Sequence, residues 1–183
     1  MLCKPGNFRA IILKVIILSF FVLSNVWAES SEHEIFKKAK IYYDKKKYKE
    51  AVSGFTRVIQ ITPDNFVAYY CRGNAYHRAG KPDLAISDYL KAMQLAPDYA
   101  GSYMGRGAVY LQRNKNEEAL ADFNRAIELN PEFPEAYYDR ALVYFVKKEY
   151  DKSWADAHKA ALLGWKVRPQ FLESLRKASG RDK

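Results

Sequence analysis

Cysteine and histidine, the residues that most often bind metals or act as nucleophiles and bases, are scarce in this chain. Two cysteines, Cys3 and Cys71, and three histidines occur among 183 residues. His33, His77 and His158 lack the spacing of metal ligands, and only Cys71 follows the first 28 residues. If those first residues are removed, Cys71 has no second cysteine with which to form a disulfide inside the chain. No residue that would orient or activate Cys71 as a nucleophile can be identified either. The fold must therefore rest on an apolar core.

Nucleotide-binding loops are also missing. Gly80-Lys81 lacks the glycine that a phosphate-binding loop carries five residues earlier, and Gly105-Arg106-Gly107 lies inside a predicted helix. We therefore expect no cofactor and no enzymatic activity.

No apolar run reaches the roughly 20 residues that a membrane-spanning helix needs. The run Val15–Leu23 follows the basic residues Lys4, Arg9 and Lys14, and small or medium-sized residues precede a charged segment after Ala28. This pattern is typical of a secretory signal peptide cleaved after Ala28. We expect export to a periplasm or the exterior, with a bacterial envelope as the setting. The alternative is a retained N-terminal membrane anchor.

Basic residues outnumber acidic ones, 30 to 21, and the signal peptide accounts for three of them. They gather near the two ends of the remaining chain, at Lys37, Lys38, Lys40, Lys45, Lys46, Lys47 and Lys49, and at Lys166, Arg168, Arg176, Lys177, Arg181 and Lys183. Such clusters attract an anionic envelope surface, polymer or protein. They also serve simply as a solvated face that keeps the protein soluble. Nucleic acid is not expected as a partner of an exported protein.

A period of 34 residues runs through the chain. It is most visible in the series Pro63, Pro97, Pro131, the series Tyr69, Tyr103, Tyr137, and the series Tyr76, Tyr110, Tyr144. A small residue lies between the two tyrosines of each repeat, and alanine and aromatic positions follow in the second half, as at Ala85, Tyr89, Ala119 and Phe123. The two tyrosines of a repeat are seven residues apart, which predicts one buried stripe on a helix. Gly80 and Asn114 predict left-handed turns, and proline ends each second helix.

This pattern resembles the tetratricopeptide repeat. The resemblance implies an all-α, right-handed α-solenoid of four helix-turn-helix repeats. The predicted segments are a signal peptide at 1–28, repeats at 32–65, 66–99, 100–133 and 134–165, and a C-terminal capping helix with a tail at 166–183. The cap itself is expected at 169–178, because Phe171, Leu172 and Leu175 share one face.

The resemblance also implies a concave groove lined by the first helix of each repeat. The candidate peptide-binding residues are Phe36, Lys40, Tyr43, Tyr70, Asn74, His77, Met104, Leu111, Tyr138 and Phe145. Their apolar side chains are expected to anchor a peptide, and Asn74 to bind its backbone. The alternative is that several of them pack inside the protein.

Chaperone-binding relatives hold a C-terminal carboxylate with a clamp of lysines and asparagines. The matching triplets here are Phe36, Lys40, Cys71 and Tyr70, Asn74, Gly105, so the clamp is not expected. Arg72, Arg106 and Arg140 recur in register with Asp88, Asp122 and Asp156, which predicts structural links between helices.

The leading hypothesis is an exported scaffold that binds a peptide or partner protein in the groove. The alternative is a scaffold that adheres to an anionic envelope surface through its basic ends.

Overall fold

A computed structural model describes residues 31–180. The predicted signal peptide at 1–28 and the last three residues of the predicted tail lie outside the described residues. The chain divides into two compact units, Met1–Pro63 and Asp64–Lys183. The described residues are helical with short connections and contain no strand.

The first unit is a pair of helices. Residues 31–44 are helical, and α2 (Tyr48–Ile61) follows after a short turn. The two helices cross closely where Ala39 meets Gly54, because a Cβ atom added at Gly54 would lie 2.6 Å from that of Ala39. Phe55 is fully buried, and its ring centre lies 5.4 Å from that of Phe36. An alanine–glycine crossing of this kind brings the helices close enough to bury the aromatic side chains beside it.

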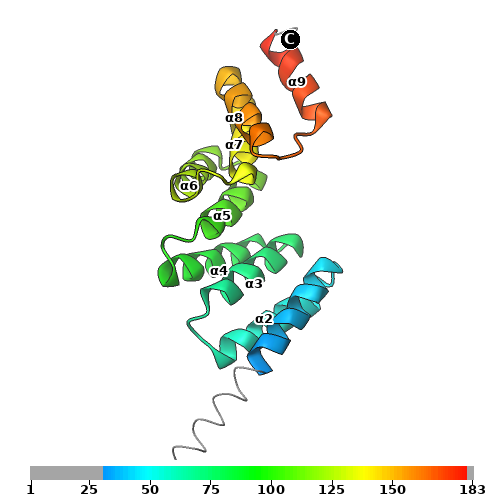
Figure 1. Cartoon of the computed structure of the whole chain (residues 1–183), viewed down its shortest axis with the longest axis vertical. Helices are drawn as coiled ribbons and strands as arrows, with labels where there is room; N and C mark the ends of the chain where they lie inside the picture. The colour runs from blue at the N-terminus through cyan, green and yellow to red at the C-terminus, as the bar shows by residue number, and fades with distance from the viewer. Residues whose placement is uncertain (1–30, 181–183) are drawn as a thin grey trace, which may run out of the picture. The chain divides into compact units, whose positions relative to one another are not determined.

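The second unit consists of three helix pairs and a final helix (Figure 1). Its helices are α3 (Phe66–Arg78), α4 (Pro82–Leu95), α5 (Ala100–Gln112), α6 (Asn116–Leu129), α7 (Pro134–Val146), α8 (Tyr150–Leu162) and α9 (Pro169–Ser179). Each odd-numbered helix from α3 to α7 packs against the next helix, and consecutive pairs also contact each other. The chain is therefore an all-α repeat solenoid, as expected. Among the described helices, none has both the length and the apolar character needed to cross a bilayer.

The cores of the second and third repeats are each built around one aromatic side chain packed against glycine. Tyr89 is fully buried, and a Cβ atom added at Gly73 or Gly105 would come within 2.8 or 2.7 Å of its ring. Phe123 meets Gly107 in the same way, at 2.8 Å. The small residue between the two tyrosines of a repeat therefore makes room for an aromatic ring, because a larger side chain would overlap it.

The turns inside the repeats are left-handed in all four repeats. The predicted Gly80 and Asn114 have φ angles of 70° and 58°. Lys46 and Lys148 occupy the same place with φ angles of 59° and 62°. Sequence reasoning missed these two, because lysine has no intrinsic preference for the left-handed region.

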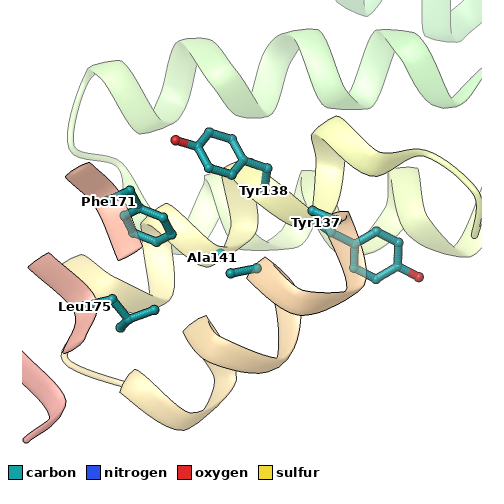
Figure 2. Packing of buried hydrophobic residues seen from close by; sticks show 7 residues of the cluster. Tyr137, Tyr138, Ala141, Phe171 and Leu175 are labelled. Carbon is teal, nitrogen blue, oxygen red and sulfur yellow. The ribbon is translucent and has the colours of Figure 1, made fainter. Parts of the chain in front are cut away.

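The final helix, α9, covers the last repeat. Phe171 and Leu175 are buried in one cluster with Tyr138, Ala141 and Ala157 (Figure 2). The fourth repeat has Ala157 where earlier repeats carry an aromatic residue. The apolar side chains of α9 supply the volume that this alanine lacks, so α9 completes the core of the fourth repeat.

Candidate binding groove

The candidate groove of the second unit lies on the first helices of its repeats. Helix α3 contacts α5, and α5 contacts α7, whereas no comparable contact joins α4 to α6 or α6 to α8 within this described unit. The first helices therefore lie on the inner side of the stack, and the second helices fan out on the other side. The predicted groove residues of this unit all belong to α3, α5 and α7.

Tyr70 and Asn74 form the polar and aromatic part of the groove on α3. Tyr70 is partly buried, with its ring centre 5.1 Å from that of Tyr99 and 6.2 Å from that of Tyr89. The hydroxyl of Tyr89 donates a 2.6 Å hydrogen bond to Oδ1 of Asn74. That bond orients the Asn74 side chain and uses its carbonyl oxygen as the acceptor. Within residues 31–180 the Asn74 amide N–H groups have no acceptor, and the contact of Asn74 with a peptide backbone stays a prediction.

Helices α3 and α5 are bridged at the far end of this surface. Nε2 of the partly buried His77 lies 2.9 Å from Oε1 of the exposed Gln112. Burial lowers the pKa of His77, and the hydrogen bond to Gln112 opposes that effect. Met104 and Leu111 on α5 are partly buried and pack at the edge of the cluster around Phe123. The middle of the groove therefore presents apolar side chains that are only half covered.

The groove does not continue as an open surface over the fourth repeat. Tyr138 is 5% exposed, and its ring centre lies 5.7 Å from that of Phe171 on α9 (Figure 2). Its hydroxyl accepts a 2.7 Å hydrogen bond from Nε of Arg168. Phe145 also contacts Phe171, at 5.8 Å. The interpretation of Tyr138 as a ligand-facing residue is therefore corrected, because α9 covers it, whereas Phe145 is partly buried and its role in binding stays a prediction.

The predicted groove residues of the first unit are more varied. Lys40 is exposed, whereas Phe36 and Tyr43 are partly buried. Phe36 packs edge-on against Phe55, and Tyr43 against Tyr48, with ring centres 5.7 Å apart. Taken by itself, the first unit therefore carries one exposed cation and two aromatic side chains that already have packing partners.

The repeated arginine–aspartate pairs are structural links, as predicted. Nε and Nη2 of Arg72 each donate a 2.8 Å hydrogen bond to Asp88, and the same two-bond geometry recurs between Arg106 and Asp122. Arg140 donates the same two hydrogen bonds to Asp156, each 2.7 Å long. Hydrogen bonding to the aspartates raises the pKa of Arg72 and Arg106 above the ordinary value. Such paired, partly buried arginines tie the two helices of a repeat together.

The tyrosine stripe differs from the prediction of a buried stripe. Only Tyr137 among the recurring tyrosines of the second unit is buried, and the others are partly exposed. All of these except Tyr103 stack instead on the linking arginines. The Arg72 guanidinium, for example, lies 5.5 Å from the Tyr69 ring centre and 5.8 Å from that of Tyr76. Arginine stacks readily on aromatic faces, and sequence spacing alone did not separate this role from burial.

Asp139 on α7 provides a pH-dependent element beside the covered end of the groove. Burial raises the pKa of Asp139 from 3.8 to about 6, Glu135 adds to the effect, and Arg168 opposes it. The folded chain therefore holds this proton at pH values where the unfolded chain has released it. As a result, stability decreases as the pH rises from about 4 to about 7.

We expect Asp139→Asn to remove this dependence. The substitution should stabilise the chain by up to about 3 kcal/mol at pH 7.5 and by almost nothing at pH 3.5. Urea denaturation of both proteins at the two pH values measures the difference. An equal difference at both values would show that Asp139 ionises normally in the folded chain.

Comparison with known families agrees with this architecture. A family model described as TPR repeat matches residues 39–80 and 107–147, and one described as tetratricopeptide repeat matches residues 66–99. Together these matches cover more than half of the chain. No curated protein matches it.

Several solved structures are similar. The first TPR of Spaghetti (RPAP3), bound to an HSP90 peptide, shares 31% identity with a TM-score of 0.60, over 63% of this chain and 91% of that one. A thermophilic TPR protein of Thermus thermophilus has a TM-score of 0.69 at 23% identity, over 80% of each chain. MamA protein has a TM-score of 0.65 at 22% identity, over 81% of this chain and 82% of that one. The repeat matches and the helix pairs agree, and the chain belongs to the tetratricopeptide-repeat family.

Proposed function

We propose that this chain is an exported scaffold that binds an extended peptide, or an extended segment of a partner protein, on the face formed by α3 and α5. Tetratricopeptide repeats generally mediate protein–protein interactions and are typically not enzymes. One similar structure, the first TPR of Spaghetti, is bound to an HSP90 peptide. The clamp residues are missing from the matching places here, which favours a ligand other than a chaperone C-terminus.

The observation that carries this proposal is the difference between the two stripes of apolar residues. Tyr89 and Phe123 on the second helices are fully buried, whereas Tyr70, Met104 and Leu111 on the first helices are only partly covered. Half-covered aromatic and aliphatic side chains on adjacent helices form the kind of surface on which peptide side chains are desolvated. Asn74 supplies amide N–H groups beside them.

The test is a binding measurement with a selected peptide. Peptides are first selected from a random library on the immobilised full chain. Fluorescence anisotropy then measures one such peptide against the wild type and Tyr70→Ala/Leu111→Ala, at about 50 mM and about 300 mM salt. We expect the double variant to bind at least ~10-fold more weakly at both salt concentrations, because it removes two apolar anchors.

Tyr103→Ala is the control, since Tyr103 is a partly buried tyrosine on a neighbouring stripe of α5, about 80° around the helix from Leu111. Circular dichroism verifies that each variant is folded. If the double variant binds as tightly as Tyr103→Ala, peptide binding on this face is wrong.

Export is the second part of the proposal. The basic start, the apolar run and the small residue Ala28 support it, and all of them lie outside the described residues. Mass spectrometry of the chain from a bacterial expression host should show a mature N-terminus at Glu29 in the periplasmic fraction. An intact N-terminus in the membrane fraction would instead support a retained anchor.

Adhesion to an anionic envelope surface is a second candidate function. The seven clustered lysines of the first unit are all exposed, and within residues 31–180 none of them forms an ion pair. Binding to vesicles with anionic lipids that disappears at about 300 mM salt and ignores Tyr70→Ala/Leu111→Ala would favour this function.

A further inference from the structure

The first repeat lacks the arginine–aspartate link that the other repeats share. The places held by Arg72 and Asp88 in the second repeat are held by Lys38 and Gly54 in the first. Ile35 also replaces the tyrosine that stacks on the arginine in the second and fourth repeats. The side chains that fill the space between the two helices at these three places are therefore smaller or absent in the first repeat.

A hollow occupies the place of these groups. It has a volume of about 360 Å³ and is lined by Ile35, Lys38, Tyr42, Glu50, Gly54 and Arg57, among others. Nζ of Lys38 lies 6.0 Å from the ring centre of Tyr42, close to the 5.8 Å between Arg72 and Tyr76. The cation of the first repeat is therefore held over the same tyrosine as its counterpart, but no aspartate reaches it from α2.

The cations on the wall of the hollow have no carboxylate partner. Within residues 31–180, neither Lys38 nor Arg57 forms an ion pair, and both side chains are exposed. Glu50 also lines the hollow. The lining therefore contains two cationic side chains and one carboxylate, and its net charge is positive. This balance favours an additional negative group inside it.

We propose that this hollow binds the carboxylate of an aspartate or glutamate side chain, presented by an acidic peptide segment of a partner. That carboxylate takes the place that Asp88, Asp122 and Asp156 fill in the other repeats. An exposed ion pair contributes little alone, so neighbouring peptide residues and the surrounding lysines must add to the attraction. The site is separate from the proposed groove, because Ile35, Lys38 and Tyr42 lie on a different stripe of their helix from Phe36, Lys40 and Tyr43.

Comparison with the second repeat suggests a variant that fills the hollow. An aspartate at position 54 would place a carboxylate where Asp88 lies in that repeat. Gly54→Asp alone would overlap Ala39, whose Cβ lies 2.6 Å from the position of the new one. Ala39→Gly/Gly54→Asp avoids the overlap and reproduces the Gly73 and Asp88 pairing of the second repeat. Lys38→Met removes the cation without any change at the crossing. Lys45→Met is the matched control, because Lys45 is an exposed lysine of the same unit that does not line the hollow.

The experiment is a titration of the ¹⁵N-labelled full chain with acetyl-tetraglutamate-amide, followed by NMR. Acetyl-tetraglutamine-amide and glutarate are titrated in parallel. We expect the acidic peptide to shift the amide signals of Gly54 and its neighbours, and the glutamine peptide to leave them unchanged. Lys38→Met and Ala39→Gly/Gly54→Asp should each weaken binding about 3- to 5-fold, while Lys45→Met should weaken it less than ~2-fold.

Two results would overturn the proposal. Equal weakening by Lys38→Met and Lys45→Met, with shifts spread over all the lysines, would show a diffuse basic surface. Binding of glutarate at the same concentration as the peptide would identify a site for small acids. The groove variant Tyr70→Ala/Leu111→Ala is included, and it should leave this titration unchanged, so that failure here is distinguished from failure of the proposed function.

Discussion

Tyr89→Ala is expected to lower the free energy of unfolding by about 4 kcal/mol. The side chain is fully buried, and its ring fills the space left by Gly73 and Gly105, which belong to consecutive repeats. Alanine would leave a cavity between these two glycines, and neither has a side chain that can move into it. The loss therefore combines the transfer energy of the ring with an uncollapsed cavity.

Tyr89→Phe separates packing from hydrogen bonding. Phenylalanine keeps the ring and removes the hydroxyl group, which donates the 2.6 Å bond to Asn74, so we expect a loss of about 1 kcal/mol. Urea denaturation followed by circular dichroism measures both variants. Similar losses for the two substitutions would mean that the hydrogen bond, and not the ring between the glycines, holds these repeats together.

The second large effect is expected at Leu175, the fully buried residue of α9. Leu175→Asp places a charge in the cluster formed with Tyr138 and Phe171, and a buried unpaired charge costs several kcal/mol. The response with the lowest free-energy cost is for α9 to leave the surface, since it is the last described helix and its main contact is with α8. We expect a loss of about 3 kcal/mol or more in the stability of the docked helix.

Two tryptophans report this event. The ring of Trp165 lies 6.1 Å from that of Tyr138, and Nε1 of Trp154 donates a 3.2 Å hydrogen bond to Ser179 at the end of α9. Release of α9 should shift tryptophan emission to longer wavelength. Ser174→Asp is the charge-matched control, because Ser174 is an uncharged, exposed residue of the same helix. An unchanged spectrum for Leu175→Asp would contradict the docking of α9 on the fourth repeat.

Much of the fold is local and could therefore be predicted. Helices α4 and α6 begin at Pro82 and Asn116, as the sequence indicates, because proline and acidic residues favour a first turn. The arginine–aspartate links were also predictable, since each pair recurs at a fixed separation within one helix pair. In contrast, the stacking of tyrosines on those arginines was missed, because the same spacing fits a buried stripe.

The candidate site was less predictable, and Tyr70 and Tyr138 show why. Both occupy the same place in their repeats, yet Tyr70 is partly open and Tyr138 is covered by α9. A repeat pattern assigns a side chain to a face of its helix, but it does not say whether a later helix packs on that face. The hollow beside Gly54 is similar, because it exists only where two helices cross and a filling side chain is missing.

The sequence by itself determined the repeat register, the helix pairs and the links inside each repeat, because these depend on contacts between residues a fixed, short distance apart in the chain. Only the tertiary structure decided which groove residues stay open, that the side-chain oxygen of Asn74 is already occupied, and where the first repeat lacks a carboxylate. These features depend on packing between elements, in which one additional helix or one missing side chain changes exposure without changing the repeat pattern.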